Sequence, residues 1–316
     1  MKRHLVTGCA GFVGSTIVDR LVRDGHDVIG IDNFSTGREE FLIDASRTGA
    51  FRLIRGDLVD PEVTLRAMPG VDTVFHIAAN ADVRFGTDHP TRDFEQNTRV
   101  TLNVLEAMRA HDVRRIVFSS TGSIYADTTE IPTPEDAPLP LQTSVYGASK
   151  IAAESFIQAY SEGFGIQSFI FRFVSLLGDR YTHGHVVDFY RQLREHPDRL
   201  HVLGDGKQRK SYLFVGDCVD AIMHVIATSQ NRIDVFNLGT DEYCEVDDSI
   251  GWIVAALDAR PTITYSGGRQ GWIGDNPFIF LDTKKILATG WRPTLTIRQA
   301  VERTIRYLSE RENAPV

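Results

Sequence analysis

Short apolar runs alternate with longer segments of helical periodicity along the first half of the chain. Such runs predict strands that are buried on both faces of a sheet, because runs this short are not typical of helices. Residues 97–111 form one of the intervening segments, with apolar positions at helical spacing. The runs predict strands at residues 4–7, 28–31, 51–56, 71–78 and 116–118. Strands that alternate with helices indicate a parallel α/β sheet.

The pattern continues past a proline-rich connection and then becomes mixed. It predicts a helix at 146–162, a strand at 170–174 and a helix at 186–194. The apolar run at 213–217, with the helix after it, is expected to return to the first domain. We therefore predict an α/β fold with a doubly wound parallel sheet and a smaller mixed α/β substrate domain. The first domain is expected at 1–171 plus about 213–240, and the second at about 172–212 plus 241–316.

Composition is that of an ordinary globular protein and limits the partners. The 316 residues are 42% hydrophobic, and the net charge of −8 with a pI of about 5.7 argues against a nucleic-acid partner. Cys9, Cys218 and Cys244 form no Cys-x-x-Cys pair, which favours a reducing compartment. No run is long and apolar enough for a signal core or a membrane span. We expect a soluble cytoplasmic protein without a metal site, since no acid or Cys completes a ligand set with His183 and His185.

A glycine-rich turn lies between the first predicted strand and the helix after it. Gly8, Gly11 and Gly14 follow the strand, an amphipathic helix is expected from about Ser15 to Arg23, and Asp32 ends the second strand. Glycines let the backbone approach a pyrophosphate, and the helix N-terminus offers N–H donors and the positive end of its dipole. The carboxylate can bond adenosine ribose hydroxyls and would repel a 2′-phosphate, which favours NAD over NADP. A glycine triplet alone is a weak signal for a Rossmann dinucleotide site, but the strands, the helix and the acid complete the pattern.

Three further positions in this half have two interpretations each. Asp57 follows the third predicted strand, and it could bond an adenine amino group or cap the helix that begins near Pro61. Ala78 and Ala79, after the fourth strand, are small enough for a cofactor to lie against the strand end. His76 lies inside that strand, so we interpret it as a buried histidine with satisfied hydrogen bonds rather than as a catalyst.

Tyr146 and Lys150 are the candidates for proton transfer. They lie four residues apart, so a helix places them on one face. A cation beside a phenol lowers the pKa of the phenol, which makes Tyr146 a plausible proton acceptor. Thr121 follows Ser119 and Ser120 at the carboxyl end of the fifth strand, where open parallel sheets bind ligands. Without that context, a Tyr–Lys pair indicates surface residues, and a Ser/Thr cluster indicates a turn or a cap.

Together these motifs resemble those of the extended short-chain dehydrogenase/reductases. Within that family they are most similar to NAD-dependent nucleotide-sugar epimerases of the UDP-glucose 4-epimerase type. The resemblance covers nearly the whole chain. The matching segments are Thr7-Gly8-x-x-Gly11-x-x-Gly14, residues 32–37, Gly56-Asp57-Leu58, His76-Ile77-Ala78-Ala79, Asn97, Ser119-Ser120-Thr121, Tyr146-x-x-x-Lys150, Gly204-Asp205-Gly206-x-Gln208 and Gly290-Trp291-x-Pro293.

The resemblance implies NAD as the cofactor and assigns roles to residues. It implies that Tyr146 is the base, that Lys150 bonds the nicotinamide ribose and lowers the pKa of Tyr146, and that Thr121 bonds the sugar hydroxyl. Family members commonly dimerise through two helices of each subunit, so we expect a homodimer through the helices of Asn97 and Tyr146. The residues implied to contact NAD are Gly8, Gly11, Phe12, Val13, Gly14, Asp32, Asn33, Ser35, Thr36, Gly37, Asp57, Leu58, Ala78, Ala79, Asn97, Ser119, Tyr146 and Lys150.

Gly122 and Ser123, directly after Thr121, narrow the reaction that the resemblance implies. Related 4,6-dehydratases have an Asp-Glu pair here, and related decarboxylases have a Glu at the second position. Neither Gly nor Ser exchanges a proton near neutral pH, which favours epimerisation. We expect inversion at C4 of a nucleotide-diphosphate sugar, of the UDP-glucose/galactose or UDP-glucuronate type, through a transient 4-keto intermediate. The alternatives are an NAD(P)-dependent nucleotide-sugar reductase or dehydrogenase, a 4,6-dehydratase, and a non-enzymatic dinucleotide-sensing protein.

Several positions leave the family pattern where the substrate would bind. Ser175 stands where many relatives have Asn, Lys210 stands where they have Arg, and Trp272 precedes Asp275 where they have Arg. Arg84 follows Val83 as in glucuronate-type epimerases, although a solvated loop Arg or a cofactor-phosphate contact is the competing interpretation. These positions leave the sugar and the nucleotide base open. The residues expected to contact the substrate are Arg84, Thr121, Gly122, Ser123, Tyr146, Ser175, Arg209, Lys210, Trp272 and Asp275.

Overall fold

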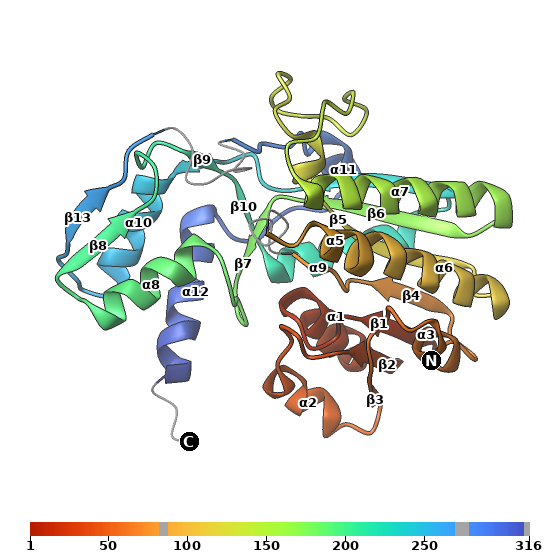
Figure 1. Cartoon of the computed structure of the whole chain (residues 1–316). Helices are drawn as coiled ribbons and strands as arrows, with labels where there is room; N and C mark the ends of the chain where they lie inside the picture. Colours follow the sequence, from red (N-terminus) through yellow and green to blue (C-terminus); the bar gives the residue numbers. More distant parts are fainter. Residues whose placement is uncertain (82–87, 269–277, 313–316) are drawn as a thin grey trace. The chain divides into compact units, whose positions relative to one another are not determined.

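The computed structural model describes residues 1–81, 88–268 and 278–312, and these residues contain a seven-stranded sheet (Figure 1). The strands are β1 (Arg3–Thr7), β2 (Asp27–Asp32), β3 (Phe51–Arg55), β4 (Thr73–His76), β5 (Arg115–Thr121), β6 (Gln167–Phe173) and β11 (Ile233–Leu238). Their order is β11-β6-β5-β4-β1-β2-β3. β1 pairs in parallel with β2 and β4, so the order reverses at β1. This reversal confirms the predicted doubly wound sheet and puts the expected ligand crevice beyond the carboxyl ends of β1 and β4.

The strand predicted at 71–78 is shorter in the structure, and the side chain of Thr7 explains why. Thr7 Oγ1 accepts hydrogen bonds from the backbone N–H groups of Ile77 and Ala78, at 3.1 Å and 3.2 Å. A side chain therefore replaces the strand ladder at this point, and β4 ends at His76. The chain is thereby free to turn away from the sheet at the position where a ligand would enter.

Helices α3, α6 and α7 pack side by side beside this sheet. Ser144 caps the N-terminus of α7, where its Oγ accepts from the N–H of Gly147 at 3.0 Å. Gly165, with a φ of 68°, caps the C-terminus. Their apolar faces meet the strands in a core that includes Leu5, Val104 and Ile157. The helical elements here are α1 (Phe12–Arg23), η1 (Glu39–Leu42), α2 (Ile43–Ser46), α3 (Pro61–Ala67), α5 (Pro90–Asp93), η2 (Phe94–Arg99), α6 (Val100–Ala110), η3 (Gly122–Tyr125) and α7 (Val145–Phe164).

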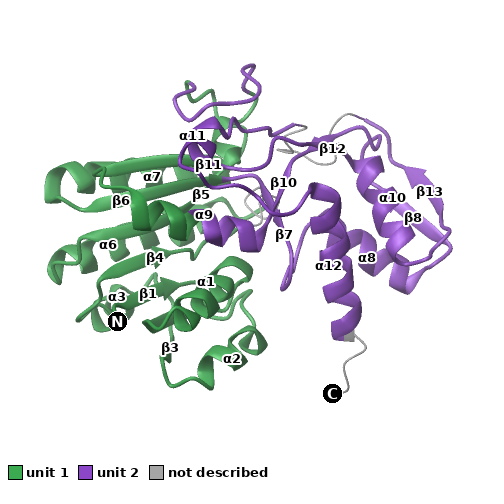
Figure 2. Ribbon diagram, turned by 180° about the vertical axis from the view of Figure 1, so that it is seen from behind, with its two compact units in different colours: residues 1–127, 138–172, 222–236 green, residues 128–137, 173–221, 237–316 purple. Residues whose placement is uncertain are grey.

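The chain forms two compact units (Figure 2). Unit 1 comprises residues 1–127, 138–172 and 222–236, and unit 2 comprises 128–137, 173–221 and 237–316. The sequence pattern assigned 213–240 to the first domain, whereas 213–221 and 237–240 belong to unit 2. Asp217 explains the first of these differences, because its carboxylate accepts from the N–H and the hydroxyl of Thr294, at 3.0 Å and 2.6 Å. A pair this distant in sequence leaves no local signal.

Unit 2 is a mixed α/β structure built from three two-stranded sheets. β7 pairs in parallel with β10, β8 in parallel with β13, and β9 antiparallel to β12. None of the described helices in either unit is long and apolar enough to cross a membrane. The remaining elements are β7 (Ser175–Leu177), α8 (His185–Glu195), β8 (Arg199–Val202), β9 (Arg209–Lys210), β10 (Tyr212–Phe214), α9 (Val215–Thr228), β12 (Cys244–Glu245), α10 (Val246–Ala256), β13 (Thr262–Tyr265), α11 (Lys284–Ala288) and α12 (Ile297–Glu312).

Ala126, which directly follows η3, has φ 40° and ψ −131°, a conformation that suits glycine. We expect Ala126→Gly to raise the free energy of unfolding by about 1 kcal/mol, because relief of backbone strain outweighs the added entropy of the unfolded chain. Urea denaturation measures this change. Ala110→Gly, at the end of α6, is the control and should lower the same quantity by about 0.5–1 kcal/mol. A loss of stability in Ala126→Gly would contradict the assignment of strain.

Candidate active site

The glycine-rich turn joins β1 to α1 through very close backbone packing. Gly8 has a φ of 66°, and a Cβ there would lie 2.8 Å from Cα of Ala78 at the end of β4. A Cβ on Gly14 would lie 2.0 Å from the carbonyl oxygen of Gly8. α1 begins at Phe12, earlier than the sequence pattern indicated, with Gly11 before it and no acidic side chain in its first turn. The turn therefore presents a helix N-terminus that fits the pyrophosphate of a dinucleotide.

Asp32 lies at the end of β2, against the glycine-rich turn. Its Oδ2 accepts from the N–H of Ala10 at 2.9 Å, and its Oδ1 accepts from the N–H of Phe34 at 2.8 Å. These bonds hold the carboxylate in one orientation and leave each oxygen a further lone pair for a ribose hydroxyl. Ser35, Thr36 and Gly37 form the loop that follows; its far end is tied back by the N–H of Arg38, which donates to the carbonyl of Ala10 at 2.9 Å.

Asp57 lies beside Asn33 and does not cap a helix. Asn33 Nδ2 donates to Asp57 Oδ2 at 3.0 Å, and Asp57 Oδ1 accepts from the N–H of Val59. The cap of α3 is Asp60, which accepts from the N–H of Glu62 at 3.0 Å. The N-cap interpretation of Asp57 is therefore wrong, because the helix begins one turn later. Leu58 is buried in the hydrophobic core.

Asn97 joins the end of β4 to α7. Its Oδ1 accepts from the N–H of Asn80 at 2.8 Å, and its Nδ2 donates to Oγ of Ser149 at 2.9 Å. Asn97 lies in η2, a π-helical turn between α5 and α6, where the sequence predicted one continuous helix. Such turns interrupt the regular ladder and are frequent at functional sites. Ala78 and Ala79 directly precede Asn80, which is bonded to Asn97. The structure therefore brings together three predicted cofactor contacts, Ala78, Ala79 and Asn97.

Tyr146, Thr121 and Lys150 meet at the carboxyl end of β5. The hydroxyl of Tyr146 is hydrogen-bonded to the side chain of Thr121. Lys150 Nζ donates to the carbonyl of Ser119 at 2.8 Å. Thr121 Oγ1 also accepts from the N–H of Ser123 at 3.1 Å and thereby starts η3, which contains Gly122 and Ser123. Proton donors and acceptors are thus clustered where an open parallel sheet binds ligands.

The electrostatics of this cluster differ from the sequence expectation. Burial raises the pKa of Tyr146 to about 12, despite the opposing effect of its hydrogen bond with Thr121. Burial lowers the pKa of Lys150 to about 7, against Glu154 and then Asp93, which raise it. The prediction that Lys150 lowers the pKa of Tyr146 is therefore wrong for this structure. Desolvation dominates both groups, and the ammonium group of Lys150 points at the carbonyl of Ser119.

His76 is confirmed as a buried histidine with satisfied hydrogen bonds. Its Nδ1 lies 2.8 Å from Oγ1 of Thr7, and its Nε2 lies 3.0 Å from Oγ1 of Thr101. Burial, with a smaller effect of Lys150, lowers the pKa of His76 to about 3. The ring is therefore neutral near pH 7 and serves to join β1, β4 and α6.

The other predicted substrate contacts lie in unit 2. Ser175 is exposed in β7, and Arg209 and Lys210 form β9. The guanidinium of Arg209 lies over the rings of Tyr243 and Phe278, at 5.4 Å and 5.7 Å from their centroids. This cation–π packing fixes Arg209 on an aromatic surface. Arg84, Trp272 and Asp275 lie outside the described residues.

Sequence reasoning missed Asp93, Ser149 and Glu154. Asp93 raises the pKa of both Tyr146 and Lys150, and its Oδ1 accepts from Asn80 Nδ2 at 2.7 Å. Helical spacing was the available signal: Asp93 lies one turn before Asn97, and Glu154 lies one turn after Lys150. Ser149 has no such signal, because only packing shows that it faces Asn97.

Comparisons with known proteins agree with this geometry. The sequence profile of the NAD dependent epimerase/dehydratase family matches residues 4–239. UDP-glucose 4-epimerase of Mycolicibacterium smegmatis is 31% identical over 310 residues, which cover 96% of this chain and 98% of that protein. A crystal structure of UDP-galactose 4-epimerase has a TM-score of 0.88 at 36% identity and covers 98% of this chain and 99% of its own. Thermus thermophilus UDP-glucose 4-epimerase in complex with NAD has a TM-score of 0.85 at 32% identity, with coverage of 97% and 99%.

Proposed function

Because the chain belongs to the NAD dependent epimerase/dehydratase family, we propose that it is a nucleotide-sugar 4-epimerase. The observation that carries this proposal is the cluster of Thr121, Tyr146 and Lys150 at the end of β5. The relatives named UDP-glucose 4-epimerase and UDP-galactose 4-epimerase support a UDP-sugar as the substrate. The reaction inverts C4 of the sugar through a transient 4-keto intermediate.

NAD is the cofactor of this reaction and, when bound, supplies the hydride acceptor. The glycine-rich turn and the N-terminus of α1 would hold its pyrophosphate. Asp32 would bond the adenosine ribose, and its charge disfavours a 2′-phosphate. Asp57 and Asn33, which bond one another, would border the adenine. These roles remain proposals for the individual residues.

Tyr146 and Lys150 move the substrate proton as a pair. With pKa values of about 12 and about 7, both groups are protonated in acid, and Lys150 loses its proton as the pH rises through about 7. The remaining proton can lie on either group, and the form with phenolate and ammonium accepts the proton of the sugar 4-hydroxyl. Thr121 would bond the same hydroxyl. When hydride returns to the other face of C4, Tyr146 gives the proton back.

Gly122 and Ser123 favour epimerisation over elimination. Elimination of water across C5 and C6 needs an acid and a base beside those carbons. The backbone of Gly122 and the hydroxyl of Ser123, which accepts from Thr121 at 3.2 Å, supply neither near neutral pH. At Gly122 and Ser123 the structure therefore favours return of the keto intermediate by reduction over elimination of water.

The finer assignments of assembly and compartment are also proposals. We propose a homodimer through α6 and α7, which pack against one another and carry exposed Phe156 and Phe164 on α7. Light scattering of the purified protein tests this, and a monomer at micromolar concentration would contradict it. We place the protein in the cytoplasm, which is supported by its three cysteines, all buried and free.

A panel of UDP-, GDP-, CDP- and dTDP-sugars tests the proposed reaction. We expect the 4-epimer of at least one UDP-sugar, with retained NAD detected by mass spectrometry and no net NADH. A substrate deuterated at C4 should keep its label in the product, because the same hydride returns. A dehydrated or reduced product without any 4-epimer would contradict the proposal and favour the dehydratase or reductase alternative.

A further inference from the structure

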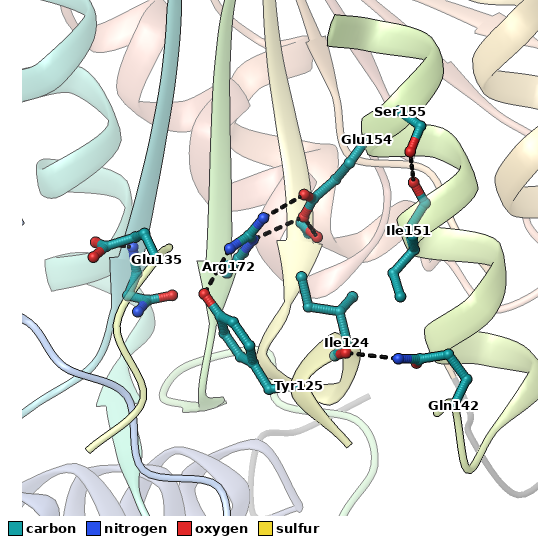
Figure 3. A network of polar contacts seen from close by, with 10 residues as sticks. Ile124, Tyr125, Glu135, Gln142, Ile151, Glu154, Ser155 and Arg172 are labelled. Carbon is teal, nitrogen blue, oxygen red and sulfur yellow. Dashed lines mark hydrogen bonds and ion pairs between the residues drawn. The ribbon is translucent and has the colours of Figure 1, made fainter. Parts of the chain in front are cut away.

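A buried network of four polar side chains joins β5, η3, α7 and β6 in unit 1, and Figure 3 shows Arg172 with two of its partners, Glu154 and Tyr125. Arg172 donates to Glu154 through two bonds, Nη2 to Oε2 at 2.8 Å and Nε to Oε1 at 3.1 Å. Its Nη1 donates to the hydroxyl of Tyr125 at 2.6 Å. Ser120 donates from Oγ to Oε1 of Glu154. The Arg172 and Glu154 side chains are 7% and 4% exposed, so water hardly screens the ion pair.

The network begins and ends beside the residues proposed to act on the substrate. Ser120 stands in β5 between Ser119, whose carbonyl accepts from Lys150, and Thr121. Tyr125 ends η3, the turn that begins after Thr121 and contains Ser123. Arg172 therefore fixes the end of η3 at Tyr125, while Ser120 fixes the strand that precedes η3. Both Arg172 and Ser120 bond the carboxylate of Glu154.

Glu154 brings that carboxylate to the catalytic helix. It lies one turn after Lys150 on the same face of α7. The titratable groups that interact with Lys150 are Glu154 on α7, Asp93 on α5 and neutral His76 on β4. Tyr146 lies one helical turn before Lys150 on α7. Glu154, ahead of Asp93, raises the pKa of Lys150 against the effect of burial. The network thus acts on charge as well as on position.

We propose that Glu154 and Arg172 are positioning residues, whose buried ion pair holds η3 against α7 and keeps a negative charge one helical turn from Lys150. This inference rests on the proposed function, because it concerns the same reaction. None of the four hydrogen bonds described above reaches the glycine-rich turn or Asp32, so we expect cofactor retention to be independent of the network. Its loss should slow proton transfer, because a small misplacement of reacting groups costs a large factor in rate.

If the network only stabilised the fold, its loss would leave the kinetics unchanged. Because the ion pair is buried, a suitable variant can separate this role from a positioning role. Removing one partner strands a buried charge and destabilises the fold, whereas replacing both by apolar residues of similar size is often neutral or stabilising. The variant Glu154→Met/Arg172→Met with Tyr125→Phe and Ser120→Ala removes every polar member of the network together. If the network only stabilised the fold, this variant would keep wild-type kinetics.

The test measures the melting temperature, retained NAD and the pH profile of kcat/KM for 4-epimerisation. For the fourfold variant we expect wild-type NAD retention and a roughly 100-fold lower kcat. We also expect the acid limb of kcat/KM to move to lower pH by about one unit, because Lys150 loses a neighbouring anion. Glu162→Gln is the matched control, because Glu162 lies on the same helix in an exposed ion pair with Arg232 at 3.0 Å. Its loss should change neither kcat nor the acid limb of kcat/KM.

Tyr125→Phe/Ser120→Ala, which leaves the ion pair intact, keeps the inference testable if the fourfold variant does not fold. We expect a roughly 10-fold lower kcat with the acid limb unchanged, since only position is altered. A folded fourfold variant, or this double variant, with wild-type kcat would overturn the inference. Failure of the proposed function is distinguishable, because the wild-type protein would then form no 4-epimer, whatever the variants do.

Discussion

Tyr146→Phe should lower kcat for 4-epimerisation by about 10³-fold while NAD stays bound to the purified protein. The phenol hydroxyl is the atom proposed to exchange the proton of the sugar 4-hydroxyl, and Phe keeps the ring that fills the buried site. Thr121 loses the hydrogen bond to Tyr146 but still caps η3 through the N–H of Ser123. Coupled assays of the 4-epimer and mass spectrometry of the released cofactor measure the two effects.

Tyr160→Phe is the matched control for this prediction. Tyr160 lies on the same helix, α7, and its hydroxyl donates to Oε1 of Glu106 at 2.5 Å, away from Thr121. Its loss should leave kcat within about twofold of the wild type, since a surface hydrogen bond has small effects. Wild-type turnover in Tyr146→Phe, or an equal loss in Tyr160→Phe, would remove Tyr146 from its proposed role.

Lys150→Met should move the acid limb of the pH profile from about pH 7 to above pH 9 and lower kcat near pH 7 by about 10²-fold. In the wild type, kcat/KM should rise with pH and level off above about 7, because the pair loses its first proton there and Lys150 has the lower pKa. In the variant only the phenol can titrate, and its pKa of about 12 lies far above the range. The rate should then rise about tenfold per pH unit from pH 6 to 9 without levelling off.

The kinetics of Lys150→Met between pH 6 and 9 decide this prediction. Lys207→Met is the control, because Lys207 is an exposed lysine paired with Asp247 at 2.9 Å in unit 2. It should keep the wild-type profile. An acid limb near pH 7 that persists in Lys150→Met would assign the titration to another group. His76 is a poor candidate for that group, because burial holds its pKa at about 3.

The fold was predictable wherever its determinants are local in sequence. Apolar runs, helical periodicity and the spacing of Gly8, Gly11 and Gly14 are read directly along the chain, and they predicted β1 to β6 and α7 within a few residues. The first helix and the fourth strand were misjudged at their ends. The N-terminus of α1 lies at Phe12 because a glycine precedes it, and β4 stops where the side chain of Thr7 replaces the ladder.

The same division runs through the candidate site. Tyr146, Lys150 and Asp32 could be found because helical spacing and a strand end are sequence features. The partners of Asn97 and Asp57 could not, because Ser149 and Asn33 are brought to them by packing across elements. The resemblance to a known family implied that Asn97 and Asp57 contact the cofactor, but it did not identify the residues that hold them in place.

The sequence by itself determined the sheet, the dinucleotide turn and the three candidates for proton transfer. Only the tertiary structure decided the charge states of Tyr146 and Lys150, because desolvation depends on what surrounds a group in space and not on its neighbours in the chain. It also decided that Arg172 bonds Glu154, two residues on different elements. Burial thus holds the pKa of Tyr146 near 12 and that of Lys150 near 7, whereas helical spacing alone indicated a lowered pKa for Tyr146.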